Sequence, residues 1–166
     1  MVGIHNPTGG FRGGKYSAFE GGTRVPTIVC WKGRVAPSAS NALISQVDLL
    51  SSIASLVGEE VNSYNLDSRN YLSAWLGTDD KGRDALLEES STLAVRKGGW
   101  KYIKPFEGQT SAWMADKGIE SGLSSEAQLF NLTEDPKESN NIASKFPEKT
   151  KELDQWILEL TSSKMD

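Results

Sequence analysis

The sequence predicts an α+β fold in which a strand and a helix end an α/β domain, and a small antiparallel sheet covered by a C-terminal helix follows. The apolar, β-rich run Thr27–Trp31 predicts the strand. Two glycines, Gly98 and Gly99, lie between alternating runs, which is typical of a hairpin with a primed turn. Apolar residues spaced three and four apart after Pro147 predict the final helix.

The strand at Thr27–Trp31 needs neighbouring strands. Its residues are apolar on both sides, as in a strand buried on both faces of a mixed α/β sheet. Cys30, the only cysteine, is expected to be a small buried hydrophobe there, and it can form neither an internal disulfide nor a cysteine-based zinc cluster. No other convincing strand precedes residue 25, so we expect the chain to be the tail of a larger protein.

A helix is predicted over residues 41–57. Ser40 or Asn41 is expected to cap its start, and Gly58 is expected to follow its end as the left-handed residue. The apolar positions that define its inward face are Leu43, Val47, Leu50, Ala54 and Val57. We assign residues 1–62 to the tail of the α/β domain.

Residues 63–166 are assigned to a C-terminal α+β subdomain. Leu93–Lys97 and Trp100–Lys104 form the two arms of the predicted hairpin, and Gln128–Leu132 is expected to be another strand. Residues 84–90 suit either a strand or a helix, because leucine and glutamate are tolerated in both.

The polar connection over residues 105–126 is longer than an unstructured loop usually is. A short helix or a binding element is therefore expected around Trp113. The helix that begins near Pro147 has an apolar face with helical spacing, made of Leu153, Trp156, Ile157 and Leu160.

Composition excludes some classes of function. The 166 residues include 18 Lys and Arg against 22 Asp and Glu, a net charge of −4, which argues against a general nucleic-acid binder. No apolar run reaches the length of a transmembrane helix, and residues 1–7 lack the apolar core of a signal peptide.

Lys15 is the candidate functional residue. It lies in the stretch 12–26 with four glycines, which let the main chain approach a ligand closely while the lysine supplies a point charge. This combination predicts an anion site, and the alternative is a solvated loop lysine. Arg12 and Arg24 either bind anions too or brace the loop, for instance by pairing with Glu20.

The stretch 12–26 closely resembles the segment that opens the C-terminal part of the type I, formylglycine-dependent sulfatases of the alkaline-phosphatase-like superfamily. Three further segments resemble that family in the same order. They are Asp48-Leu49-Leu50 in the helix, the strand pair Leu93–Ile103, and Gln128–Ala143 with its Asp-Pro turn.

The resemblance implies a sulfuric ester hydrolase that acts on sulfate esters, usually of sulfated carbohydrates, with Lys15 contacting the sulfate. It also implies a formylglycine made from a Cys/Ser-x-Pro-x-Arg motif, whose hydrate oxygen attacks sulfur, and a calcium ion. The sequence contains no such motif and no acidic cluster with the spacing of a calcium site, so both are expected in a missing N-terminal catalytic portion. The chain alone is then expected to be inactive.

Other residues are candidates for substrate contacts under this resemblance. His5, the only histidine, either contacts the sugar or the leaving oxygen or is an ordinary surface residue. Arg12 is a further candidate for a contact with the substrate anion. Trp113 either stacks on a sugar ring or packs in a core or an interface.

The alternative is a free-standing, non-catalytic module derived from a sulfatase, which binds carbohydrate or serves as an interaction module. A fragment should expose Ile28, Val29 and the helix at 41–57, and should tend to self-associate, whereas a module should bury them. The family relation further implies a periplasmic or extracellular location. It leaves open which sulfate ester is bound.

Overall fold

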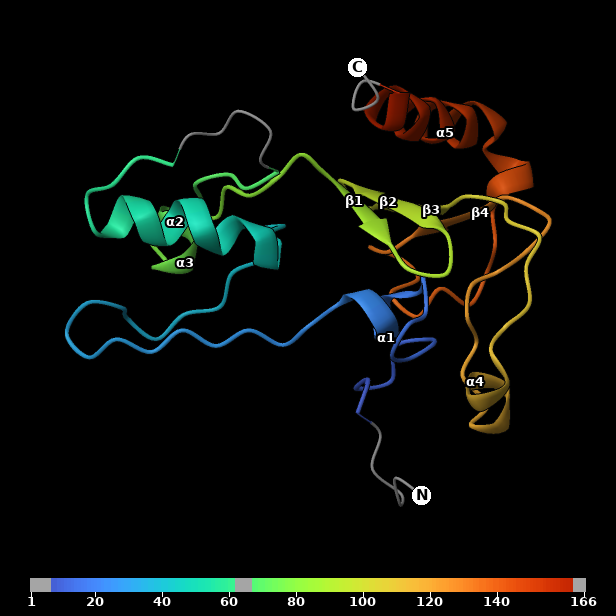
Figure 1. Cartoon of the computed structure of the whole chain (residues 1–166), viewed down its shortest axis with the longest axis horizontal. Coiled ribbons are helices and arrows are strands. Elements are labelled where there is room, and N and C mark those ends of the chain that lie inside the picture. Colours follow the sequence, from blue (N-terminus) through green and yellow to red (C-terminus); the bar gives the residue numbers. More distant parts are fainter. Residues whose placement is uncertain (1–6, 62–66, 163–166) are drawn as a thin grey trace. The chain divides into compact units, whose positions relative to one another are not determined.

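Four strands form one sheet in the order β1-β2-β3-β4 (Figure 1). The computed structural model describes residues 7–61 and 67–162. The strands are β1 (Ala85–Glu89), β2 (Leu93–Lys97), β3 (Trp100–Ile103) and β4 (Gln128–Asn131). β3 pairs antiparallel with both β2 and β4. This sheet confirms the predicted α+β class and shows that the ambiguous segment around residue 87 is a strand.

The hairpin between β2 and β3 has the predicted two-residue turn. Lys97 pairs with Trp100, which leaves only Gly98 and Gly99 in the connection. Gly98 has φ +58°, a left-handed conformation that glycine adopts without a Cβ clash. The turn chemistry therefore sets the strand register.

The core lies between the sheet and the segment that contains Ala18 and Phe19. Phe19 and Phe130 meet edge to face with ring centroids 6.0 Å apart. The cluster of buried apolar residues consists of Ala18, Phe19, Ala94, Ile103 and Phe130. The N-terminal loop thus contributes directly to the packing of β2, β3 and β4.

The C-terminal helix α5 (Pro147–Ser162) packs on β2 and β3, as predicted (Figure 1). Leu153 and Ile157 are fully buried on its inner face. The carboxylate of Asp154 accepts hydrogen bonds from Tyr102 Oη at 2.9 Å and Lys104 Nζ at 2.7 Å. Apolar burial and these polar contacts together fix the helix on the sheet.

The long connection between β3 and β4 holds a short helix, as predicted. This helix, α4 (Ala112–Asp116), carries Trp113, and Met114 is its buried residue. A β-bridge between Phe106 and Ser124 closes the base of the connection. The segment is therefore ordered by its own contacts.

The chain divides into two compact units. One comprises Met1–Val25 with Leu87–Asp166, and the other is Pro26–Leu86. The predicted boundary at residue 62 lies outside the described residues and stays a prediction.

The second unit contains the 3₁₀ turn η1 (Gln46–Asp48), α2 (Leu49–Leu56) and α3 (Leu72–Trp75). The helical segment begins later than residue 41, because the Asp48 carboxylate accepts a hydrogen bond from the Ser45 backbone nitrogen at 2.9 Å. The predicted caps at Ser40 and Asn41 were therefore wrong. The predicted end is confirmed, since Gly58 follows α2 with φ +80°.

Asp48 is the main polar anchor of the second unit. It is fully buried and accepts hydrogen bonds from the Arg83 guanidinium, at 2.8 Å from Nε, and from the Arg69 backbone nitrogen at 2.9 Å. Burial alone would raise the pKa of Asp48, but the hydrogen bonds from Arg83 and the backbone lower it below its ordinary value.

The predicted strand at Thr27–Trp31 is not formed. Residues 26–31 have no regular secondary structure and are exposed, with Ile28 at 91%. Cys30 is exposed as well, so its predicted burial was wrong. The physical reason is that a strand apolar on both faces requires pairing strands and covering layers, and the described residues of this unit supply neither.

Candidate functional site

The Lys15 loop comprises residues 11–23, including α1 (Glu20–Thr23), and is held by close backbone contacts. The Ser17 nitrogen donates to the Gly14 oxygen at 2.8 Å, and the Gly21 nitrogen donates to the Arg12 oxygen at 2.9 Å. A Cβ at Gly21 would lie 2.4 Å from that Arg12 oxygen. Glycine is required here because two backbone segments touch.

Arg12 braces the Lys15 loop. Its guanidinium donates to both carboxylate oxygens of Glu120, at 2.6 and 3.0 Å, and to the backbone oxygen of Glu138 at 2.7 Å. Its Cζ also lies 4.0 Å from the centroid of the Phe19 ring. The hydrogen bond to Glu120 raises the pKa of Arg12 and lowers that of Glu120. These contacts match the bracing role; binding of substrate by Arg12 stays a prediction.

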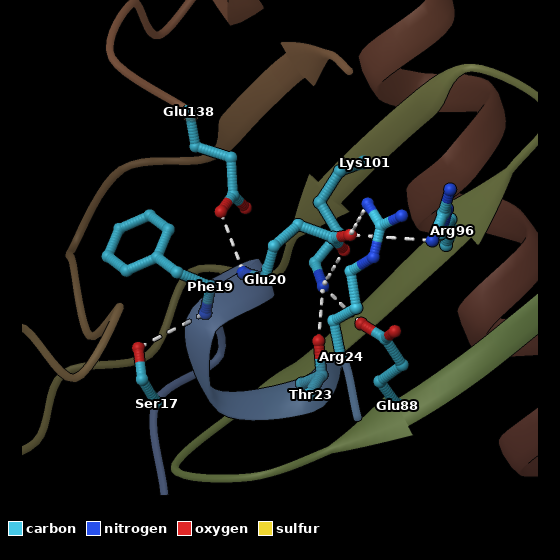
Figure 2. Close-up of polar contacts among 9 residues, drawn as sticks. All are labelled: Ser17, Phe19, Glu20, Thr23, Arg24, Glu88, Arg96, Lys101 and Glu138. Atoms are coloured by element: carbon cyan, nitrogen blue, oxygen red, sulfur yellow. Dashed lines mark hydrogen bonds and ion pairs between the residues drawn. The ribbon is translucent and has the colours of Figure 1, made fainter. Parts of the chain in front are cut away.

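A buried charge cluster lies where α1 meets the sheet (Figure 2). Lys101 on β3 is fully buried, and its Nζ lies 3.3 Å from Glu20 Oε1 and 3.2 Å from Thr23 Oγ1. The same nitrogen donates to the carboxylate of Glu88 on β1. Burial would lower the pKa of Lys101, but the two nearby carboxylates raise it above its ordinary value.

Two arginines complete this cluster around Glu20. Arg96 lies 3.4 Å and Arg24 lies 3.9 Å from Glu20 Oε2. The predicted pairing of Arg24 with Glu20 is therefore confirmed. Because Glu20 belongs to α1 and Arg96 to β2, their ion pair attaches the Lys15 loop to the sheet, whereas the pair with Arg24 is local to the end of α1.

Glu138 holds α1 from the opposite side (Figure 2). Its Oε2 accepts a hydrogen bond from the Glu20 backbone nitrogen at 2.7 Å, and its other carboxylate oxygen has no partner among the described residues. The side chain is fully buried. Burial raises the pKa of Glu138 to about 7, although the Lys101 charge acts in the opposite direction.

Lys15 is exposed and lies beside an aromatic residue. Its Nζ lies 5.0 Å from the centroid of the Tyr16 ring. Among the described residues, no carboxylate lies within ion-pair distance of Lys15. Its charge is therefore available to an anionic ligand.

Tyr16 has a backbone conformation that is rare for a side-chain-bearing residue, with φ +71°. Its carbonyl oxygen accepts hydrogen bonds from Ser90 Oγ at 2.5 Å and Ser91 Oγ at 3.2 Å. Its ring meets that of Trp113 edge to face, with centroids 5.6 Å apart. The conformation is thus fixed by contacts from two other segments.

A cavity of about 340 Å³ opens beside these two aromatic residues. Aromatic and small polar side chains share its wall. The residues that line it are Tyr16, Ser91, Phe106, Gly108, Gln109, Ser111, Trp113, Met114 and Leu123. Polar groups beside apolar walls are a lining that can orient a small ligand, and this hollow is wide open to solvent.

His5 lies outside the described residues. The described part of the chain contains no group of three potential metal ligands and no helix long and apolar enough to cross a membrane. Sequence reasoning missed Lys101 and Glu138, because an isolated lysine in a strand and a glutamate after a turn look like ordinary surface residues.

Known proteins resemble this chain in sequence. The family model described as "Sulfatase" matches residues 3–59. N-acetylgalactosamine-6-O-sulfatase of Bacteroides thetaiotaomicron is 39% identical over 156 residues, covering 92% of this chain and 30% of the relative. Arylsulfatase A of Bos taurus is 32% identical over 173 residues, covering 96% of this chain and 34% of the relative.

Solved structures are also similar to this chain. A structure described under the metabolism of multiple glycosaminoglycans by Bacteroides thetaiotaomicron superposes with a TM-score of 0.88 and 37% identity. It covers 97% of this chain, which spans 34% of that structure. A sulfatase from Pseudoalteromonas sp., with a TM-score of 0.72 and 22% identity, covers 92% of this chain and 32% of its own, and shares the fold.

The fold and the braced lysine loop, together with these matches, define the class: the chain belongs to the sulfatase family. More particularly, it corresponds to a C-terminal part of such a protein and spans about a third of the length of the curated relatives it matches.

Proposed function

We propose that this chain is the C-terminal portion of an enzyme that hydrolyses sulfate esters, and that Lys15 contacts the sulfate group of the substrate. The observation that carries the proposal is an exposed lysine on a loop whose base is fixed by buried ions. Lys15 would donate to a sulfate oxygen and offset negative charge that builds up as the ester bond breaks. A rigid base is what such a contact needs, since stabilisation of charge depends on preorganised donors.

The proposed substrate class is a sulfated carbohydrate. A relative that covers most of this chain is named for N-acetylgalactosamine 6-O-sulfate, and this name supports an amino sugar sulfate as the first candidate. His5 and Arg12 are further candidates for contacts with that substrate. We place the working enzyme in the periplasm or outside the cell, because sulfatases that act on polysaccharides are usually exported.

We propose that an N-terminal catalytic portion supplies the nucleophile and the metal. The residues described here do not fit either group, since they contain neither a Cys/Ser-x-Pro-x-Arg sequence nor a cluster of metal ligands. The chain by itself is therefore expected to be inactive.

The same N-terminal portion would cover the apolar surface of the second unit. Ile28, Leu50, Ile53 and Val57 are 91, 54, 53 and 66% exposed. This exposure favours a part of a larger sheet domain over a free-standing module, because a module would bury such residues. Left uncovered, the surface would promote self-association.

The test begins with the coding DNA upstream of Met1, read in frame for a Cys/Ser-x-Pro-x-Arg segment. The longer protein is then expressed with Lys15→Ala, and sulfate release from N-acetylgalactosamine 6-sulfate is measured. We expect kcat/KM to fall roughly 10² to 10³-fold. Lys32→Ala, which removes another exposed lysine, is the matched control and should retain the full rate.

Equal rates for the two variants would contradict the role of Lys15. A start codon and promoter directly before Met1, with no such segment upstream, would instead support a free-standing carbohydrate-binding module.

A further inference from the structure

The cavity beside Lys15 has aromatic walls that the sulfate contact does not use. Tyr16, Phe106 and Trp113 are 59, 53 and 39% exposed, although large aromatic side chains are usually buried. All three line the same cavity of about 340 Å³. Their exposure is therefore concentrated at one concave place.

The walls are held in position by the surrounding chain. Tyr16 has its rare backbone conformation fixed by the hydroxyl groups of Ser90 and Ser91. Trp113 is placed by α4, whose neighbouring residue Met114 is buried. A strained residue that several contacts hold in place is commonly found at a ligand site.

We propose that this cavity binds the pyranose ring of a carbohydrate, with Trp113 and Tyr16 as the surfaces against which the ring packs. The inference rests on the proposed function for the nature of the ligand, and it assigns the sugar-binding residues that the proposed function leaves open. The aromatic faces bury the apolar C–H face of the ring.

Polar residues of the cavity suit the hydroxyl groups of a sugar. Gln109 and Ser111 are among the residues that line it, and their side chains carry donors and acceptors that suit ring hydroxyls. Ser91 also lines it, and its hydroxyl oxygen can still accept a hydrogen bond while its proton is donated to the Tyr16 oxygen. A purely apolar protein segment would leave such groups unpaired, at a cost in free energy. The wall chemistry therefore favours a carbohydrate over an apolar protein segment.

Positive charge next to the aromatic rings selects among sugars. Lys15 Nζ lies 5.0 Å from the Tyr16 ring centroid, and Lys117 Nζ lies 5.6 Å from the Trp113 ring centroid. Two ammonium groups at the aromatic walls favour a ligand that carries an anionic substituent. A sulfated sugar has both features.

The test uses the chain itself, labelled with ¹⁵N, because all the lining residues belong to it. N-acetylgalactosamine 6-sulfate is titrated while the indole N–H signals are followed by NMR. We expect the Trp113 signal to move and the Trp31 signal to stay. Trp113→Ala should weaken binding about tenfold, Trp113→Phe should retain most of it, and Trp31→Ala, which removes a similarly exposed tryptophan, should have no effect.

Far-UV circular dichroism of each variant shows whether it is folded, and Trp113→Phe keeps the test valid if Trp113→Ala does not fold. The proposal is overturned if the titration leaves the Trp113 signal in place, or if Trp113→Phe and Trp113→Ala, both folded, bind like Trp31→Ala.

Unsulfated N-acetylgalactosamine separates this inference from the proposed function. If both sugars bind equally and both depend on Trp113, the cavity binds carbohydrate but the sulfate role of Lys15 fails. If only the sulfated sugar binds, and its binding depends on Lys15 but not on Trp113, the sulfate role stands and the sugar cavity is refuted.

Discussion

Replacing Glu138 by glutamine should stabilise the folded chain at pH 8 and leave its stability almost unchanged near pH 4. Glutamine keeps an oxygen that can accept the hydrogen bond from the Glu20 backbone nitrogen, which is 2.7 Å long in the native chain. It lacks the charge that burial disfavours. The substitution therefore removes the penalty and keeps the contact.

The magnitude follows from proton linkage. Burial raises the pKa of Glu138 from 4.5 to about 7, so the folded chain binds this proton more tightly than the unfolded chain. Stability contributed by this group is then fully present below pH 4.5 and is lost as the pH rises through about 7. At pH 8 the native glutamate should cost about 3 kcal/mol relative to an uncharged isostere.

Urea unfolding followed by circular dichroism at pH 4 and pH 8 measures the difference in free energy of unfolding. Glu134→Gln is the matched control, because it changes an exposed glutamate of the same turn region. The control should differ little from the native chain at either pH. If Glu138→Gln is no more stable than the native chain at pH 8, the carboxylate is not the buried, destabilising group that the structure indicates.

Two further substitutions test the base of the Lys15 loop. Lys101→Met removes the fully buried cation that pairs with Glu20. The free energy of unfolding, measured in urea titrations, should therefore fall by about 3 to 5 kcal/mol. A loss below about 1 kcal/mol would show that Arg24 and Arg96 are enough to compensate the charge of Glu20. Gly21→Ala places a Cβ 2.4 Å from the Arg12 oxygen and should cost about 2 kcal/mol or more. Gly14→Ala, whose Cβ would meet only a side chain at 3.4 Å, is its control, and equal melting temperatures would contradict the clash.

The sequence was sufficient where local chemistry decides the structure. The hairpin at Gly98 follows from turn chemistry, the end of α2 follows from Gly58, and α5 follows from helical spacing of its apolar residues. The prediction of a strand at Thr27–Trp31 was wrong because its structure is not decided locally. Its apolar composition signals burial, but burial depends on partner strands that a local pattern cannot supply.

The candidate site divides in the same way. Lys15 and its glycines are adjacent in sequence, so the loop could be predicted. The residues that hold the loop could not be predicted, because Lys101 and Glu138 lie 81 and 118 residues from Glu20 in the sequence. Contacts over such separations leave no periodic signal, and a buried charge cannot be told from a solvated one by residue type alone.

The buried charge cluster around Glu20 is better explained by the orientation that it gives to α1 than by a gain in stability. Buried ion pairs contribute little net stability, because desolvation offsets their attraction, and Glu138 is expected to reduce it at neutral pH. Yet the same groups hold α1 at two different points: Lys101 binds the side chain of Glu20, and Glu138 binds its backbone nitrogen. Two such contacts on one residue fix the orientation of the short helix as well as its position. The proposed contact between Lys15 and a sulfate needs that orientation, which an apolar base of similar volume would not specify.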